Sequence, residues 1–242
     1  MPPASEDRSA PTGLVWFDPP PRTAERFSRE MIVTAAVELA DEDVRGEVTM
    51  RAVAARVGAR TPMSLYRYVG NKDGLVDLML DEVYGEIVVP EPGDWRACLR
   101  ELGSSGWEAV QRHPWFARLS FSRPPLGPHA LAMYDRSLAA LDGLGLDAAT
   151  RMGFVGTVLG HVLSSGLALL EERAMRERAG LRTDGELTEA VRPYLDRIAR
   201  EGRHPHFSRW AADPARLEPA PQSFEQVLEW LLDGLERSVN RG

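Results

Sequence analysis

The feature that most restricts the fold of this chain is a run of four short helix patterns in residues 28–87. Each pattern begins at a residue that can cap a helix and continues with apolar residues at helical spacing. The expected caps are Ser28, Thr49, Thr61 (followed by Pro62 at the first helical position) and Asn71. The second and third helices are short, and Gly58 lies between them. Two short helices joined by a glycine-containing turn, with a helix on each side, predict a helix-turn-helix DNA-binding unit.

Apolar spacing supports each of these helices. The inward positions are expected at Ile32, Ala35, Ala36, Leu39 and Ala40; at Met50, Val53, Ala54 and Val57; at Leu65; and at Val76, Met79, Leu80, Val83 and Ile87. The first helix is expected to end near Glu42 and the third near Tyr68.

Charge is unevenly distributed, although the net charge of -7 at first argues against a nucleic-acid partner. Residues 49–72 contain five basic residues and no acidic one, so the rest of the chain carries -12, that is, -7 less the +5 of this window. A positive window in an acidic protein can face DNA while the remaining surface is repelled by it.

The third helix is expected to present one face to a DNA groove. With Leu65 inward and about 100° per residue, Met63 and Arg67 point outward. Ser64 and Tyr66 lie on the flanks, and Tyr68 leans back towards the core. Arg67 can donate two hydrogen bonds to guanine, Met63 can pack on a thymine methyl, and the flanking side chains can reach a base or a phosphate. Thr49, Tyr68 and Lys72 stand at helix ends, where phosphate contacts are common.

The alternative is that these are solvated basic residues and aromatic core residues of a small helical domain. For Arg56 this alternative is favoured, because Arg56 is expected to cover the second helix. For Tyr68 the two interpretations are balanced. For the group as a whole, the agreement of charge, caps, turn and helix lengths favours DNA binding.

The residues from Thr49 to Gly58, from Met63 to Val69 and from Asn71 to Leu75 resemble the DNA-binding domain of the tetracycline-repressor (TetR) family. The resemblance implies a homeodomain-like three-helix domain in which the helix near Thr61 is the recognition helix. It also implies that Tyr66 and Arg51 contact DNA and that Lys72 meets a phosphate. The turn between Gly58 and Tyr66 is one residue longer than is usual in the family, so contacts by Arg60 and Thr61 stay open.

The rest of the chain predicts a second, all-helical domain. Pro90 to Gly93 is the expected boundary. The expected organisation has three parts: a flexible Pro-rich arm (residues 1–22), a DNA-binding domain (23–88) and a helical ligand-binding and dimerisation domain (94–242). Trp16 of the arm can dock elsewhere on the protein. Further helices are expected at about 94–112, 114–122, 127–144, 147–178, 187–200 and 224–239. Pro193 is expected to kink or delay the fifth of these, and Gly202 to Pro221 is expected to be an irregular connection.

This second part resembles the C-terminal domain of TetR-type regulators through Asp94-Trp95-Arg96, His113-Pro114-Trp115, the turn at 123–127 and the Gly-rich helix through Gly160. The resemblance implies a homodimer that encloses a small-molecule pocket, with its seam on the Gly-rich helix and the terminal helix. Small residues at Gly153, Gly156 and Gly160 would allow close helix approach. A core role within one subunit is the alternative. A two-fold dimer requires a palindromic double-stranded operator.

The candidate ligand-binding residues are large or polar-tipped groups on the helices expected to surround the pocket. They are Trp107, His113, Trp115, Phe116, Met133, Phe154 and His161. Each can instead be an ordinary core residue, and His113 can instead cap the helix that begins at Pro114. No metal or cofactor is expected, since His204 and His206 make only a weak pair.

One segment, Met152 to Leu170, contains no charged residue over nearly the length of a membrane span. Its glycines, serines and His161 favour a buried central helix without membrane insertion. The single Cys98 and the absence of a signal-peptide pattern fit the cytoplasm.

The leading function is that of a transcriptional repressor that a small molecule releases from DNA. Two alternatives belong to other classes: an all-helical enzyme acting on a small molecule, and an interaction module without DNA binding. The sequence contains no nucleophile elbow, P-loop or dinucleotide fingerprint, which disfavours the enzyme. The window without acidic residues disfavours the interaction module.

Overall fold

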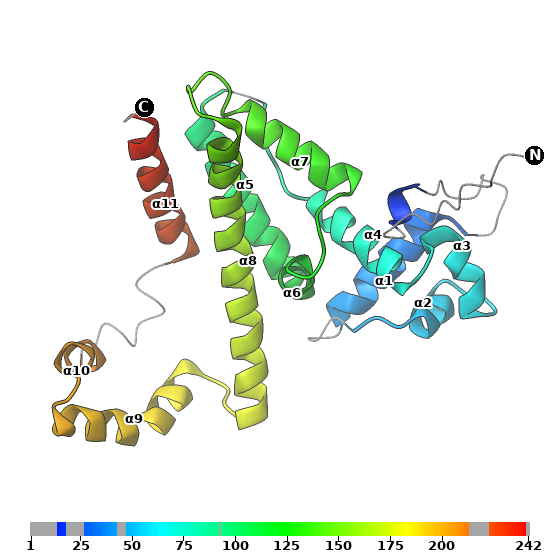
Figure 1. The fold of residues 1–242 in the computed structure, drawn as a ribbon. Coiled ribbons are helices and arrows are strands. Elements are labelled where there is room, and N and C mark those ends of the chain that lie inside the picture. Colours follow the sequence, from blue (N-terminus) through cyan, green and yellow to red (C-terminus); the bar gives the residue numbers. More distant parts are fainter. Residues whose placement is uncertain (1–13, 18–26, 43–46, 92, 213–222, 241–242) are drawn as a thin grey trace, which may run out of the picture. The chain divides into compact units, whose positions relative to one another are not determined.

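The computed structural model describes residues 14–17, 27–42, 47–91, 93–212 and 223–240, and these contain helices and loops but no strand (Figure 1). The first unit comprises residues 1–88 and 112–135, and the second comprises 89–111 and 136–242. The predicted Pro-rich arm lies outside the described residues except for residues 14–17. The elements are η1 (Val15–Phe17), α1 (Arg29–Glu42), α2 (Met50–Arg56), η2 (Pro62–Leu65), α3 (Tyr66–Val69), α4 (Lys72–Tyr84), α5 (Trp95–Arg112), α6 (Pro114–Ser120), α7 (Pro128–Ala139), α8 (Ala148–Ala179), α9 (Asp184–Glu201), α10 (Pro205–Ala211) and α11 (Phe224–Val239).

The first two helices of the first unit, α1 and α2, follow their predicted signals. The Ser28 hydroxyl accepts a hydrogen bond from the Met31 N–H at 3.2 Å, and the Thr49 hydroxyl accepts one from Ala52 N–H at 3.1 Å. Helix α1 buries Ile32 and Ala36 and packs against α2 and α4. Beyond α2, Gly58 has φ +71°, a conformation that suits glycine and turns the chain away from the helix axis.

The predicted third helix is divided into two pieces. Residues Pro62–Leu65 form a 3₁₀ turn and Tyr66–Val69 form one turn of α-helix. Thr61 occupies the capping position but its side chain makes no capping hydrogen bond, so this predicted cap is wrong in that detail. Pro62 still begins the turn because its ring fixes a helical φ.

Helix α4 begins where predicted, since the Asn71 side chain accepts a hydrogen bond from Gly74 N–H at 2.8 Å. It ends at Tyr84, so Ile87, which was expected in its apolar stripe, lies beyond the helix although it is buried. The η1 segment packs on α4. Its Val15 is buried and approaches Gly74 so closely that a Cβ there would lie 3.2 Å from the Val15 Cβ.

Residues 112–135 return to the first unit and include α6 and the start of α7. Trp115 and Phe116 of α6 are fully buried, and the Phe116 ring meets that of Tyr84 edge to face at 5.0 Å. Helix α6 packs against α1 and α4. Helices α1 and α4 therefore share a core with a segment from later in the chain.

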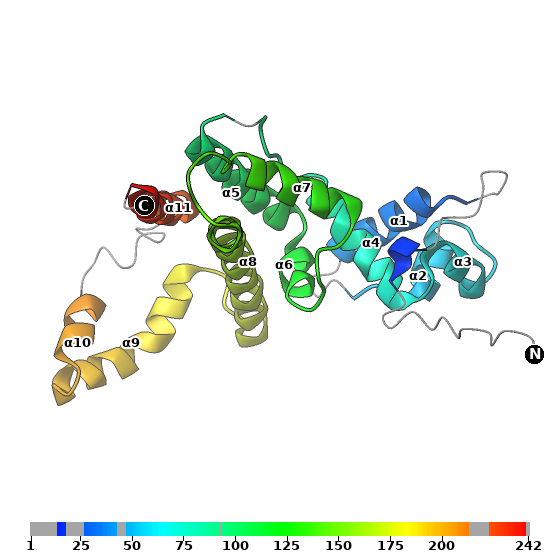
Figure 2. The same cartoon turned by 45° about the horizontal axis from the view of Figure 1, so that its top comes forward.

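The second unit is built around α5, α8 and α11 (Figure 1). Asp147 caps α8 by accepting a hydrogen bond from Thr150 N–H at 2.7 Å, and Gly180 ends it in the left-handed conformation. Helices α8 and α11 lie side by side (Figure 2). By length and composition α8 is the one described helix that could cross a membrane, and 39% of its most apolar window is buried within the chain.

Two predictions about residues 184–221 are wrong. The expected helix from Leu187 begins earlier, because Thr183 and Glu186 form a reciprocal capping box, and α9 continues through Pro193 to Glu201. The expected irregular connection contains α10, which starts at Pro205 and packs on α9. Residues 213–222 of that connection lie outside the described part of the chain.

Candidate nucleic-acid interface

The side chains of η2 and α3 divide into an inner and an outer face. Leu65 is fully buried, whereas Met63 is 74% exposed and Arg67 is also exposed. Ser64 and Tyr66 are half-buried on the flanks. This division agrees with the predicted helix orientation, while the DNA contacts themselves stay predictions.

Arg67 is held by its neighbour. Its Nη2 donates a hydrogen bond to the Tyr68 hydroxyl at 3.0 Å, and its guanidinium carbon lies 4.9 Å from the centre of the Tyr68 ring. Tyr68 is only 1% exposed. A buried ring of this kind is better suited to orienting Arg67 than to contacting a phosphate itself.

The predicted phosphate contacts stand around this face. Lys72 is the first residue of α4 and is exposed. Thr49 and Thr61 are exposed residues that directly precede α2 and η2. Backbone N–H groups in the first turn of a helix attract anions, so these positions suit phosphate oxygens.

The basic residues of the window differ in their partners. Arg56 is paired with α1, where it donates hydrogen bonds to Glu42 at 2.8 Å and to Glu38 at 3.2 Å. These carboxylates, Glu42 above all, raise the pKa of Arg56. Arg51 and Arg60 are exposed on the same unit. The structure thus places Arg56 in a contact between α2 and α1, a pairing that the sequence did not predict.

Two residues that sequence reasoning missed fasten this region. Arg29 Nε of α1 donates a hydrogen bond to the Tyr68 carbonyl at 2.8 Å and so holds the end of α3. Asp41, in the last turn of α1, accepts a hydrogen bond from Trp115 Nε1 at 2.7 Å and lies 2.8 Å from His113 Nδ1. An acidic side chain is unfavourable at a helix C-terminus, so its position was a signal that it has an outside partner.

His113 does not cap α6 with its side chain. Its ring is nearly buried, and Nε2 lies 3.1 Å from a carboxylate oxygen of Glu86 while Nδ1 faces Asp41. The imidazole thereby connects the start of α6 with the end of α1 and with the residues after α4. This explains why a histidine precedes Pro114 without any ligand being invoked.

Helix α4 is fastened to the 123–130 segment by two carboxylates. Asp81 is buried and accepts hydrogen bonds from the N–H groups of Ala130 at 3.0 Å and His129 at 3.3 Å, so it caps α7 from another helix. Asp77 accepts a hydrogen bond from Arg123 Nε at 2.6 Å. A Cβ at Gly127 would lie 2.2 Å from the Asp81 carboxyl carbon, so only glycine fits there.

The structure does not bring the seven predicted ligand residues together in one unit. His113, Trp115, Phe116 and Met133 are buried in the first unit, whereas Trp107, Phe154 and His161 belong to the second. Within the second unit, the rings of Trp107 and His161 stack on Phe224 at 4.7 and 4.4 Å, and Phe154 packs on Trp95. Which of them touches a ligand stays a prediction.

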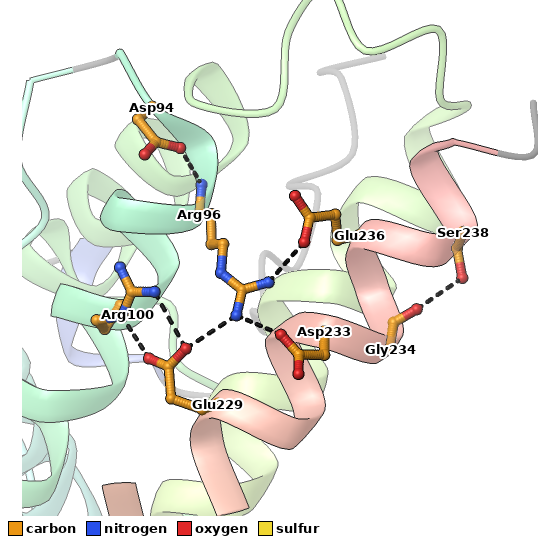
Figure 3. A network of polar contacts seen from close by, with 8 residues as sticks. All are labelled: Asp94, Arg96, Arg100, Glu229, Asp233, Gly234, Glu236 and Ser238. Carbon is orange, nitrogen blue, oxygen red and sulfur yellow. Dashed lines mark hydrogen bonds and ion pairs between the residues drawn. The ribbon is translucent and has the colours of Figure 1, made fainter. Parts of the chain in front are cut away.

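The terminal helix α11 is fastened to α5 by an ion-pair network (Figure 3). Arg96 reaches Glu229 at 2.9 Å, Asp233 at 2.5 Å and Glu236 at 2.9 Å, and Arg100 pairs with Glu229 as well. The hydrogen bonds from Arg100 and then Arg96 lower the pKa of Glu229 to about 2.

Helices α8 and α11 present glycines that have open space beside them among the described residues. We call the sides of the two helices that carry these glycines their outer faces. A Cβ added at Gly153, Gly156, Gly160 or Gly234 would meet nothing within 4 Å. Trp230 of α11 is 51% exposed. These faces could accept another helix pair closely.

Comparisons with known proteins agree with this arrangement. Residues 89–239 match the family described as tetracyclin repressor-like, C-terminal domain. The HTH-type transcriptional repressor DrrR1 of Streptomyces coeruleorubidus is 34% identical over 210 residues, which cover 86% of this chain and 76% of that protein.

Solved structures give the same result. Apo ActR from Streptomyces coelicolor is 26% identical, with a TM-score of 0.74 over 90% of this chain and 98% of its own. ActR in complex with actinorhodin is also 26% identical, with a TM-score of 0.73 over 88% and 98% of the two chains. The fold class, the family and the regulatory class predicted from the sequence are confirmed. The chain therefore belongs to the tetracycline-repressor family and is an all-helical DNA-binding transcriptional regulator, not an enzyme.

Proposed function

We propose that this chain represses transcription by binding a palindromic operator as a homodimer, and that a small molecule bound to its helical domain releases it. The observation that carries the proposal is the outer face of η2 and α3, which presents Met63, Ser64, Tyr66 and Arg67 away from a buried Leu65. This face has the size and polarity of an element that enters the major groove.

Each side chain of this interface has a role that fits its chemistry. Arg67, oriented by Tyr68, donates two hydrogen bonds to a guanine, and Met63 packs on a thymine methyl. Ser64 and Tyr66 reach base edges or phosphates at the flanks, and Arg51 is a further candidate for a base contact. Thr49 and Lys72 bind phosphates, with Arg60 and Thr61 beside them.

The homodimer is formed through the outer faces of α8 and α11. Their glycines permit close backbone approach, and Trp230 supplies apolar area for a partner. Two-fold symmetry then gives two recognition elements and a palindromic operator. Since the operator is chromosomal DNA, the protein acts in the cytoplasm.

The effector is a small molecule that binds to the helical domain. ActR, which has a similar fold, was crystallised in complex with actinorhodin. In the second unit the candidate contacts are Trp107, Phe154 and His161, and the rings of Trp107 and His161 both stack on Phe224. The other four predicted contacts, His113, Trp115, Phe116 and Met133, belong to the first unit.

Release follows from a shift between two conformations of α4. Asp77 and Asp81 fasten α4 to residues 123–130, and Asp41 fastens α1 to α6. A ligand that displaces α6 or α7 therefore displaces the helices that carry the DNA-binding face. The hinge is expected near Pro90.

The test is a mobility-shift titration on DNA upstream of the protein's own gene at several salt concentrations. Arg67→Ala and Lys72→Ala should each weaken binding, and each lost phosphate contact should lower the slope of log affinity against log salt by about one. Arg192→Ala is the matched control, because it removes an exposed arginine of α9. Absence of a shift with any palindromic probe would reject the proposal and favour an interaction module.

A further inference from the structure

The first unit contains a groove that none of the predicted site residues lines. Its volume is about 570 Å³, within the range of pockets for small organic ligands. Its walls come from η1, α1, α4 and residues 126–131, all of them parts of the first unit.

Much of the lining of this groove is apolar. Val33 of α1 and Leu78 of α4 are buried residues that line the groove, and Trp16 adds an aromatic side chain to the lining. Leu126 and Leu131 of the lining are 42% and 52% exposed. These two half-exposed leucines offer apolar surface that an apolar ligand can bury.

The charged groups around the groove are three carboxylates, one guanidinium and one imidazole. Asp81 is engaged by the N–H groups of α7, and Arg29 donates a hydrogen bond to the Tyr68 carbonyl. His129 places its Nδ1 3.2 Å from the Asp81 carbonyl. Glu30 of α1 and Glu82 of α4 are exposed carboxylates that line the groove.

Glu30 is ionised at neutral pH. Its own backbone N–H and then the Ser28 hydroxyl hold the pKa of this carboxyl below its usual value. Acidic groups therefore outnumber basic ones around an apolar groove, which disfavours anions and favours a cation with an apolar body.

We propose that this groove is a binding site for an amphipathic organic cation, with the apolar body on Val33, Leu78 and Trp16 and the positive charge between Glu30 and Glu82. None of the seven predicted effector contacts lines this groove, and the inference does not depend on the proposed operator binding.

The proposed cation site can be tested with two nearly isosteric ions of opposite charge. Their binding to the full chain is measured by isothermal titration calorimetry. Tetraphenylphosphonium should bind saturably with one site per chain. Tetraphenylborate should bind at least roughly tenfold more weakly, because each nearby carboxylate attracts the first ion and repels the second.

Variants assign the binding to this groove. The double substitution Glu30→Gln with Glu82→Gln should weaken phosphonium binding roughly three- to tenfold, as expected for two partly exposed charge contacts. Glu47→Gln, which removes an exposed carboxylate of the same unit that does not line the groove, should change nothing. Leu131→Lys should weaken phosphonium binding and strengthen borate binding, whereas Leu131→Gln should not reverse the preference.

Equal affinity for the two ions would overturn the proposal, and so would no detectable binding of the phosphonium. Binding that prefers the phosphonium but is insensitive to Glu30, Glu82 and Leu131 would also overturn it, because the ion would then occupy another site. All these residues are exposed, so the variants should fold, and thermal unfolding should show at most a small loss of stability where Glu30→Gln weakens the hydrogen bonds at the start of α1.

Discussion

The segment that contains α2, η2 and α3 (residues 49–69) and the terminal helix α11 are held in place in different ways. The segment from Thr49 to Val69 is shaped mostly by residues close in sequence, since Thr49 caps α2, Gly58 turns the chain and Tyr68 orients Arg67. One distant residue, Arg29 of α1, holds its end through the Tyr68 carbonyl. Helix α11 is fastened by residues 129 to 140 positions away, through Arg96 and Arg100. Local signals can be read from one sequence, whereas the partners of α11 become visible only in the folded chain.

The largest expected effect comes from removing the anchor of the 49–69 segment. Leu65→Ala should lower the free energy of unfolding of the first unit by about 2–5 kcal/mol, because Leu65 is fully buried. Urea denaturation followed by tryptophan fluorescence measures this loss. Met63→Ala, on the opposite face, should leave stability unchanged. Equal losses of unfolding free energy for the two variants would contradict the assignment of Leu65 to a buried face and of Met63 to an exposed one.

A smaller effect is expected at the contact between α1 and α6. Asp41→Ala should cost about 1–3 kcal/mol, since the buried Trp115 indole N–H loses its acceptor. Asp41→Asn keeps an oxygen acceptor and should cost less. If the two variants were equally stable in urea, the indole hydrogen bond would not be the source of the stability.

The stability contributed by the ion pairs between α11 and α5 should depend on pH. The pKa of Glu229 is lowered to about 2 in the folded chain, so its contribution to stability is complete above its ordinary pKa near 4.5. That contribution is lost as pH falls from 4.5 towards 2. Thermal unfolding across this range should show a smaller decline for Glu229→Gln than for the original chain. Glu108→Gln, an exposed change on α5, should decline like the original chain.

These comparisons show what the sequence could predict. Caps at Ser28, Thr49 and Asn71 gave the early helices because each signal acts over three residues. The short helix α10 was missed, because its Pro-rich surroundings hid a turn that begins at Pro205. The partners of Asp41, Asp81 and Arg29 could not be predicted, since they lie 39 to 74 positions away and depend on packing.

The smallest expected effect separates two basic residues of the same window, Arg56 and Lys72. Arg56→Ala should lower stability only slightly, because Arg56 and its carboxylate partners are exposed to solvent. It should leave the salt dependence of operator binding unchanged, whereas Lys72→Ala should reduce it. Fluorescence anisotropy with labelled operator at several salt concentrations measures both. A reduced slope for Arg56→Ala would place that residue on DNA.

The most direct test of the central claim is base discrimination at the position that Arg67 reads. Binding of the original chain and of Arg67→Ala is compared on the operator and on operators with single base-pair changes. Arg67→Ala should lose about 1–3 kcal/mol on the intact operator and should no longer distinguish guanine at one position of each half-site. Lys72→Ala should weaken binding to all the operators alike. Unchanged discrimination by Arg67→Ala at every position would contradict the assignment of the outer face of η2 and α3 as the sequence-reading surface.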